Sequence, residues 1–178
     1  MAKPKVLGIE TEYGIVRRGT ADSNPVTASS LLITAYVSDL ERSNLGGPKV
    51  NWDFEDETPG VDARDASLGS SQISPETHLV NAVLTNGARF YVDHAHPEIS
   101  TPECRDARSI VVWDRAAEEI MKRAMVAANS VLGGDQEIVV HKNNSDGKGN
   151  AYGCHENYLM ARDTPFSSIV ASAPAHLI

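Results

Sequence analysis

Hydrophobic and polar residues alternate near the start of the chain. Residues 5–16, KVLGIETEYGIV, follow the period of two that is typical of a β-strand with two different faces. On such a strand Gly8, Glu10 and Glu12 share one face, and Ile9 points to the other. We therefore predict a first strand over residues 5–16 that carries two carboxylates on one side.

Two later segments have hydrophobic residues at helical spacing. In residues 27–43, TASSLLITAYVSDLERS, Leu31 and Leu40 lie roughly in line on one helical face. Residues 106–132, DARSIVVWDRAAEEIMKRAMVAANSVL, have the longest apolar stripe, and the Gly-Gly pair at residues 133–134 supplies a stop signal. We predict one helix over each segment.

Further β-prone runs surround these helices. Asn86-Gly87 separates LVNAVLT from ARFYVD, which predicts a tight hairpin. Farther along, EIVVHK and CHENYLMAR are predicted to form another strand pair, joined by the polar segment NNSDGKGN. Because helices and neighbouring hairpins are mixed along the chain, we expect an α+β fold with an antiparallel sheet and flanking helices.

Residues 45–76 follow neither pattern. This segment is rich in Gly, Pro, Ser and Asp, with a cluster of acidic residues around Trp52 and Phe54. Loops of this length inside a domain are usually functional or disordered. We interpret the segment as a mobile insertion with a short aromatic anchor, which either gates a site or is a plain disordered insertion.

The composition narrows the class of protein. With 178 residues, 41% hydrophobic and 22% charged, the chain is expected to form one soluble globular domain. A net charge of -8 argues against a nucleic-acid binder and suits a protein that attracts divalent cations, although solubility alone explains most of the carboxylates. Cys104 and Cys154 form no CxxC pair, which favours a cytoplasmic location. There is no signal-peptide pattern and no run of about 20 apolar residues, so we expect no membrane span.

The clearest chemical pattern is ARFYVDHAHPEISTPEC, residues 88–104. On a strand Arg89, Tyr91 and Asp93 share one face, while the residues between them face an ordinary core. An arginine holds phosphate oxygens in bidentate fashion, and a carboxylate beside cations serves as a base or a nucleophile. The row therefore fits a site for phosphate and metal.

Acidic residues supply candidate metal ligands. Two carboxylates on one strand face repel each other unless a cation lies between them, and Mg²⁺ with oxygen ligands relieves that repulsion. Glu10 and Glu12 are such a pair, although an edge strand facing water explains them about equally well. Glu98 follows Pro97, where we expect the chain to leave regular pairing, and it is placed to reach the same metal.

Histidines and a threonine are weaker candidates. The spacing of His94 and His96 is a weak metal pattern, and either ring can simply brace a loop. In GCHENYL, His155 and Asn157 share a face and can bind phosphate oxygen or a metal, or form an ordinary hydrogen-bonded edge. Thr101 is a turn residue first and a ligand second.

Taken together, GIETEYG, ARFYVDHAHPEISTPEC and GCHENYL resemble the family of Pup deamidases/depupylases and Pup ligases, relatives of the carboxylate–amine ligases with a glutamine-synthetase-like sheet. The resemblance covers about residues 4–170. Two features are similar to the deamidase/depupylase branch. One is the insertion at residues 45–76 with VNWDFEDETPGVDARD. The other is the motif DHAHPE, because in the ligases one more residue lies between its Asp and its Glu.

The family chain is far longer than 178 residues. The resemblance therefore implies that residues 1–178 are the N-terminal portion of a single larger catalytic domain, with a partial glutamine-synthetase-like fold. We expect this chain alone to be inactive or unstable.

The resemblance also implies roles for individual residues. Asp93 corresponds to the catalytic aspartate, which either attacks the substrate carbonyl or activates a water molecule. The implied Mg²⁺ ligands are Glu10, Tyr91 and Glu98, the implied contacts to nucleotide phosphate are Arg89 and Thr101, and Glu12 and His155 are implied as further members of the metal and phosphate shell.

The implied activity is hydrolysis in the Pup modification pathway of protein degradation. The C-terminal Gln of Pup is deamidated to Glu, and the isopeptide bond between Pup and a lysine of a pupylated protein is cleaved. Mg²⁺ and ATP are implied as bound cofactors, and the ATP is not consumed in each turnover. Two alternatives remain, an ATP-dependent Pup–protein ligase and a truncated, non-catalytic binding module.

Overall fold

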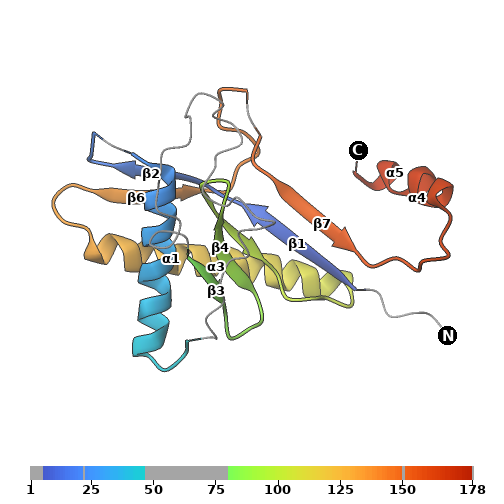
Figure 1. The fold of residues 1–178 in the computed structure, drawn as a ribbon, viewed down its shortest axis with the longest axis horizontal. Coiled ribbons are helices and arrows are strands. Elements are labelled where there is room, and N and C mark those ends of the chain that lie inside the picture. Colours follow the sequence, from blue (N-terminus) through green and yellow to red (C-terminus); the bar gives the residue numbers. More distant parts are fainter. Residues whose placement is uncertain (1–5, 22, 47–79, 150, 178) are drawn as a thin grey trace, which may run out of the picture.

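The computed structural model describes residues 6–21, 23–46, 80–149 and 151–177. These residues form an α+β fold with an antiparallel sheet and flanking helices, as predicted (Figure 1). The insertion predicted over residues 45–76, with Trp52 and Phe54, lies outside the described residues except for its first two positions. In the described part of the chain, no helix has the length and apolar character needed to cross a membrane.

Five strands form the main sheet in the spatial order β3-β4-β5-β1-β7, and every neighbouring pair is antiparallel. They are β1 (Leu7–Glu12), β3 (Asn81–Val83), β4 (Arg89–Asp93), β5 (His96–Ser100) and β7 (Cys154–Tyr158). Two more strands, β2 (Gly14–Arg18) and β6 (Glu137–His141), pair in a separate two-stranded ribbon. Strand β5 therefore lies in the middle of the main sheet and β7 at its edge.

The chain leaves the main sheet at Tyr13, so the single strand predicted over residues 5–16 is wrong. Strand β1 ends just before this residue and β2 begins just after it. The Tyr13 N–H donates to the carbonyl of Pro97 at 3.0 Å, and the tyrosine ring is buried. At Gly14, an added Cβ would lie 2.9 Å from Cζ of Tyr152. A buried ring and a tight backbone contact, neither visible in the alternation pattern, divide the segment between two sheets.

Two expectations about pairing are also wrong. EIVVHK and CHENYLMAR both contain strands, but β6 pairs with β2 and β7 pairs with β1, so the two do not pair with each other. Pro97 does not end regular pairing, since it lies inside β5 opposite Val92 of β4. An alternation pattern identifies a strand but not its partner, because the partner is chosen by contacts distant in sequence.

Both predicted helices are present. Helix α1 spans Pro25–Arg42, and the Asn24 side chain caps it by accepting the N–H of Thr27 at 3.2 Å. Helix α3 spans Ala107–Val131, where Asp106 provides the equivalent cap. The two helices begin within two residues of the predicted positions because their capping residues fix where helical hydrogen bonding starts.

Two tight turns connect the strands of the main sheet. Asn86-Gly87 joins β3 to β4 as predicted, with Gly87 at φ +85°. The turn between β4 and β5 has only two residues, His94 and Ala95, whose φ angles of 44° and 72° lie in the left-handed region that favours glycine. The Ser29 hydroxyl of α1 donates to the Ala95 carbonyl at 3.0 Å from inside the core. This hydrogen bond therefore anchors the turn between β4 and β5 to helix α1.

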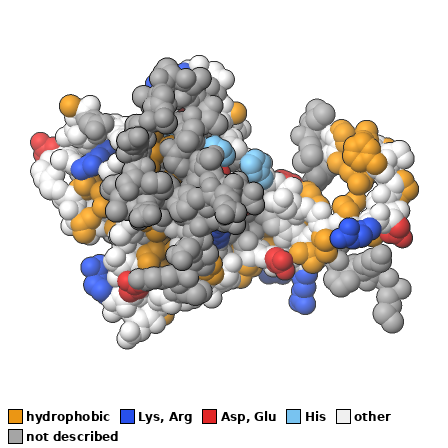
Figure 2. All heavy atoms as spheres, in the orientation of Figure 1, with side chains coloured by type: hydrophobic (Ala, Val, Ile, Leu, Met, Phe, Trp, Pro, Cys, Tyr) orange, Lys and Arg blue, Asp and Glu red, His pale blue; other side chains and the backbone are white. Residues whose placement is uncertain are grey.

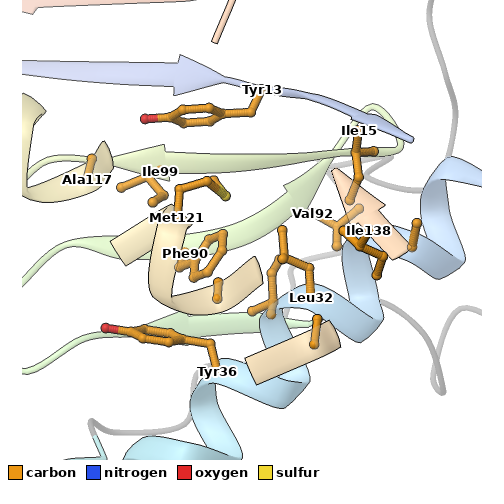
Figure 3. Close-up of a cluster of buried hydrophobic side chains, with 14 of the residues drawn as sticks. Tyr13, Ile15, Leu32, Tyr36, Phe90, Val92, Ile99, Ala117, Met121 and Ile138 are labelled. Atoms are coloured by element: carbon orange, nitrogen blue, oxygen red, sulfur yellow. The ribbon is translucent and has the colours of Figure 1, made fainter. Parts of the chain in front are cut away.

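Helices α1 and α3 cover the same face of the main sheet and make the core there (Figure 3). The core includes Phe90, Val92 and Ile99 from the sheet, Leu32 and Tyr36 from α1, and Ala117 and Met121 from α3. Each large side chain that is fully buried contributes about 1.5–3 kcal/mol. The faces of β4 are therefore assigned as predicted, and the opposite face of the sheet is left to polar residues.

The C-terminal segment stands apart from this core. Helices α4 (Phe166–Ser172) and α5 (Pro174–Leu177) follow β7 and lie away from the body of the sheet (Figure 1). Figure 2 shows hydrophobic side chains gathered on this end of the molecule. Leu159 and Phe166 of this segment are 69% and 77% exposed.

Candidate active site

Antiparallel register places polar side chains in two rows across the uncovered face of the main sheet. Residues that lie opposite each other in neighbouring strands project from the same face. One row consists of Tyr91, Glu98 and Glu12, and the next consists of Arg89, Ser100, Glu10 and His155. Four strands, β4, β5, β1 and β7, thus contribute to one acidic surface.

A tyrosine hydroxyl joins the two rows. The Tyr91 hydroxyl donates to Oε1 of Glu98 at 2.7 Å and lies 3.2 Å from Oε1 of Glu10. The Ser100 hydroxyl donates to the same Glu10 oxygen at 3.0 Å. Residues predicted as metal ligands from two separate sequence segments are therefore brought within hydrogen-bonding distance of one another.

Burial gives this cluster an unusual electrostatic state. Glu98 is 6% exposed, and desolvation raises the pKa of its carboxyl group from 4.5 to about 7, with the carboxylates of Asp93 and Glu10 adding to the rise and the Tyr91 hydrogen bond opposing it. Desolvation and the neighbouring Glu98 also raise the pKa of the Tyr91 hydroxyl. The carboxylates repel each other across a small space, and a divalent cation would relieve that repulsion.

Glu10, Glu98 and His155 form a potential metal-binding group. Each offers one ligand atom, and these atoms lie within 4.8 Å of one another. Nδ1 of His155 is 3.5 Å from Oε2 of Glu10, and its side chain is 70% exposed on β7. The two carboxylates of this group, with the Tyr91 hydroxyl beside them, are hard oxygen donors of the kind that Mg²⁺ prefers, and the His155 imidazole is the one nitrogen donor of the group.

Beside this group is a pocket of about 280 Å³, lined by Glu12, Asp93, Glu98 and His155 among others. Asp93 ends strand β4, and its Oδ2 lies 2.9 Å from Nδ1 of His94. Glu98 belongs to both the pocket and the metal-binding group. The structure therefore brings the predicted catalytic aspartate and the predicted ligands to one place.

Of the two predicted phosphate contacts, Arg89 lies opposite Ser100 in the pairing of β4 with β5, and Thr101 follows Ser100 in the chain. The Arg89 guanidinium donates through Nε to Asn81 Oδ1 at 2.8 Å and lies 4.2 Å from the centre of the Tyr91 ring. Thr101 uses its hydroxyl to accept the N–H of Ile9 at 3.0 Å, so in this structure it braces β1. A role of either residue toward phosphate stays a prediction.

Several residues of the site were not candidates from the sequence. Ser100 alternates with Glu98 on the same strand and was detectable by that spacing, and Asn81 faces Tyr91 only once β3 and β4 are paired. The Gly153 N–H donates to Oε2 of Glu12 at 2.7 Å, a contact that no sequence pattern indicates.

Comparisons with known proteins show what the chain is similar to. A family model described as Pup-ligase protein matches residues 5–178. A depupylase from Acidothermus cellulolyticus is 46% identical over 93% of this chain and 33% of its own length. A Pup deamidase/depupylase from Mycolicibacterium smegmatis is 41% identical over 98% of this chain and 36% of its own length. The chain therefore spans about a third of the length of these relatives.

Pup–protein ligases also match, at lower identity when most of the chain is compared. Among solved structures, the complex between prokaryotic ubiquitin-like protein Pup and its ligase PafA matches with a TM-score of 0.60 and 24% identity, covering 93% of this chain and 27% of that one. This likeness confirms the expected α+β fold class, with the antiparallel, glutamine-synthetase-like sheet that the resemblance implies.

Proposed function

Because this chain belongs to the Pup-ligase protein family, we propose that it forms the metal- and nucleotide-binding part of a hydrolase that acts on Pup. The observation that carries this proposal is the cluster of Glu10, Tyr91 and Glu98 beside the pocket that contains Asp93. Relatives named as depupylase or deamidase match at 41% identity or more over almost the whole chain, which supports hydrolysis over ligation.

The proposed reactions remove an amine from the same carbon. Water replaces ammonia at the C-terminal Gln of Pup, giving Glu, or replaces the lysine amine of a pupylated protein, releasing Pup. In both, a tetrahedral oxyanion develops at the Pup carbonyl and needs positive charge nearby. The proposed partners are therefore Pup and pupylated proteins.

The proposed cofactors are Mg²⁺ and ATP. Glu10, Tyr91 and Glu98 would hold the metal, with Glu12 and His155 beside them, and Arg89 and Thr101 would contact the nucleotide phosphates. When bound, the metal supplies positive charge that polarises the Pup carbonyl. Tyr91 orients the two carboxylates through its hydrogen bonds and keeps them from turning away.

Asp93 is the proposed catalytic group. It lies at the end of a strand whose turn is fixed by Ser29, so its carboxylate is held at the pocket wall. It either attacks the Pup carbonyl and forms an acyl-aspartate that water then cleaves, or takes a proton from the attacking water. Mass spectrometry of a rapidly acid-quenched single turnover decides between them, since only the first route leaves Pup covalently attached to Asp93.

A cytoplasmic location is also proposed. Its support is that Cys104 and Cys154 are both free thiols, as is typical of a reducing compartment.

The test uses a chimera, because the chain spans only a third of its relatives. This chain would replace the matching third of the Acidothermus cellulolyticus depupylase. With Mg²⁺ and ATP, the chimera should release ammonia from Pup ending in Gln and free Pup from a conjugate, and its Asp93→Asn variant should lose about 10³-fold or more in rate.

Other outcomes identify the alternatives. Accumulation of conjugate and ADP from Pup ending in Glu and a lysine acceptor would identify a ligase. Binding of Pup without either reaction would identify a binding module. The 178-residue chain tested alone should be inactive, and turnover at the rate of the chimera would contradict that expectation.

A further inference from the structure

Both oxygens of the Glu12 carboxylate have a defined neighbour. Oε2 accepts the backbone N–H of Gly153 at 2.7 Å, and Oε1 lies 3.3 Å from Nδ1 of His96. Glu12 is 9% exposed and His96 is 6% exposed, so little water competes for these contacts. The three residues come from β1, from β5 and from the segment before β7. A single side chain thus connects three parts of the chain that are distant in sequence.

The position of one histidine proton follows from the geometry. Nδ1 of His96 lies 2.8 Å from the backbone carbonyl of His94, and a carbonyl oxygen can only accept a hydrogen bond. Nδ1 therefore carries a proton whatever the charge of the ring. The same nitrogen lies 3.3 Å from Oε1 of Glu12, so a protonated nitrogen is within ion-pair distance of the carboxylate.

The imidazole ring is also held in orientation. The Tyr152 ring meets it edge-on, with centroids 5.5 Å apart and planes at 72°. Tyr152 is itself packed against Gly14, and its backbone N–H donates to the carbonyl of Asn144 at 3.2 Å. The His96 ring therefore lies between a strained two-residue turn and an aromatic ring, which restricts its rotation.

We propose that His96 is a positioning residue that holds the Glu12 carboxylate toward the pocket, where it is available to a divalent cation beside Glu98. The inference rests on the proposed function for the cation itself. Gly153 restrains one oxygen through the backbone, and His96 restrains the other through a side chain. Without His96, one oxygen of the Glu12 carboxylate loses its neighbour, and the carboxylate gains rotational freedom about its last torsion angle, so cation binding must also offset the cost of ordering it.

Binding of Mn²⁺ to the chimera with the Acidothermus cellulolyticus depupylase, measured by the paramagnetic resonance of free Mn²⁺, tests this role. Removing a group that orients a metal ligand typically weakens binding by about 10–100-fold. His96→Ala should fall in this range. His96→Asn places an amide nitrogen where Nδ1 was and should stay within about threefold of the parent, whereas His96→Gln places its amide near Nε2 and should resemble His96→Ala.

Two controls separate positioning from general damage. In a Glu12→Ala background, His96→Ala should cause no further loss of Mn²⁺ affinity, because its effect passes through Glu12. Thermal unfolding without metal should be alike for His96→Asn and His96→Gln while their Mn²⁺ affinities differ. Equal affinities for these two variants, or an additive loss in the double variant, would overturn the proposal.

A metal-free measurement distinguishes failure of this inference from failure of the proposed function. The Nδ1–H of His96 should give a slowly exchanging nuclear magnetic resonance signal that shifts in Glu12→Gln. If the parent binds no Mn²⁺ and the signal shifts, the cation site is wrong and the contact between the two residues stands. If the signal does not respond to Glu12→Gln, the positioning role is wrong whatever the metal does.

Discussion

Strands β5 and β7 lie on the two sides of β1 and pair with it in the same antiparallel manner, but their surroundings differ sharply. Glu98 of β5 is 6% exposed, while every residue of β7 is exposed. Helix α1 packs beneath β5, and β4 pairs with its other edge. Position in the sheet, more than residue type, decides which polar groups of this site are held rigidly.

The difference has an electrostatic consequence. At Glu98 desolvation dominates and raises the pKa of the carboxyl group to about 7. On β7, by contrast, a hydrogen bond to Glu156 is the main cause of the raised pKa of the Tyr158 hydroxyl. The centre of the sheet therefore has a preorganised acidic cluster, and its edge has side chains that adjust to solvent.

The largest contrast is expected in cysteine reactivity. Cys154 lies on exposed β7, whereas Cys104 is 2% exposed, and burial raises the pKa of its thiol. Under native conditions a thiol reagent should modify Cys154 more than about a thousandfold faster than Cys104, because the latter requires local opening. Mass spectrometry of the labelled chain measures both rates. Comparable rates would mean that the backbone around Cys104, which bridges to Leu7 at the start of β1, opens as readily as the edge strand β7.

Shortening an aromatic side chain should lower the free energy of unfolding much more beneath the centre of the sheet than on the edge strand β7. Phe90→Ala removes a fully buried ring beneath the site and should lower the free energy of unfolding by about 3–5 kcal/mol. Tyr158→Ala on β7 is the matched aromatic control and should cost about 0.5 kcal/mol or less, since its side chain is half exposed. Urea denaturation measures both. A large loss in the control would show that β7 contributes to the folded core.

The pH dependence of stability should identify the buried carboxyl group. Because the folded-state pKa of Glu98 is raised above its unfolded value of 4.5, its stabilising contribution is complete below pH 4.5 and is lost as the pH rises through about 7. With metal removed by chelator, ionisation of Glu98 should lower the free energy of unfolding by up to about 3 kcal/mol as the pH rises from 4.5 through about 7.

Glu98→Gln should remove this slope, and Glu156→Gln on the exposed strand should keep it. Urea titrations at several pH values give the comparison. Added Mg²⁺ should flatten the slope of the parent, because a bound cation favours the ionised carboxylate. An unchanged slope in Glu98→Gln would assign the pH dependence to other groups.

A smaller effect is expected where α1 supports the turn that carries Asp93. Ser29→Ala removes the buried hydrogen bond to the Ala95 carbonyl and should cost about 1–2 kcal/mol. Ser168→Ala in the exposed helix α4 should change stability by about 0.5 kcal/mol or less. Thermal unfolding of the two variants provides the measurement, and an equal effect would contradict the difference between the regions.

Local patterns in the sequence predicted helices α1 and α3, strands β3, β4 and β7 of the main sheet and the two faces of β4. The alternation in ARFYVD correctly separated Arg89, Tyr91 and Asp93 from the buried Phe90 and Val92, since side-chain direction on a strand depends only on the backbone period. The two helices were equally accessible, because their apolar stripes and stop or cap signals lie within the segments themselves.

What the sequence could not provide is the assembly of these elements. The approach of Glu10 to Tyr91 requires the order β4-β5-β1, which depends on pairing between residues about 90 positions apart. The break at Tyr13 and the contact of Gly153 with Glu12 arise for the same reason. Long-range contacts decide them, and no local period records such contacts.

The passage from β1 to β2 has a mechanical consequence. Glu12 ends one sheet and Gly14 begins the other, so a single residue, Tyr13, connects the acidic surface to the ribbon of β2 and β6, and the Cα atoms of Glu12 and Gly14 are at most about 7 Å apart. Such a short link transmits tension with almost no slack. A displacement of that ribbon would therefore move the backbone of Glu12, and with it the carboxylate at the end of β1.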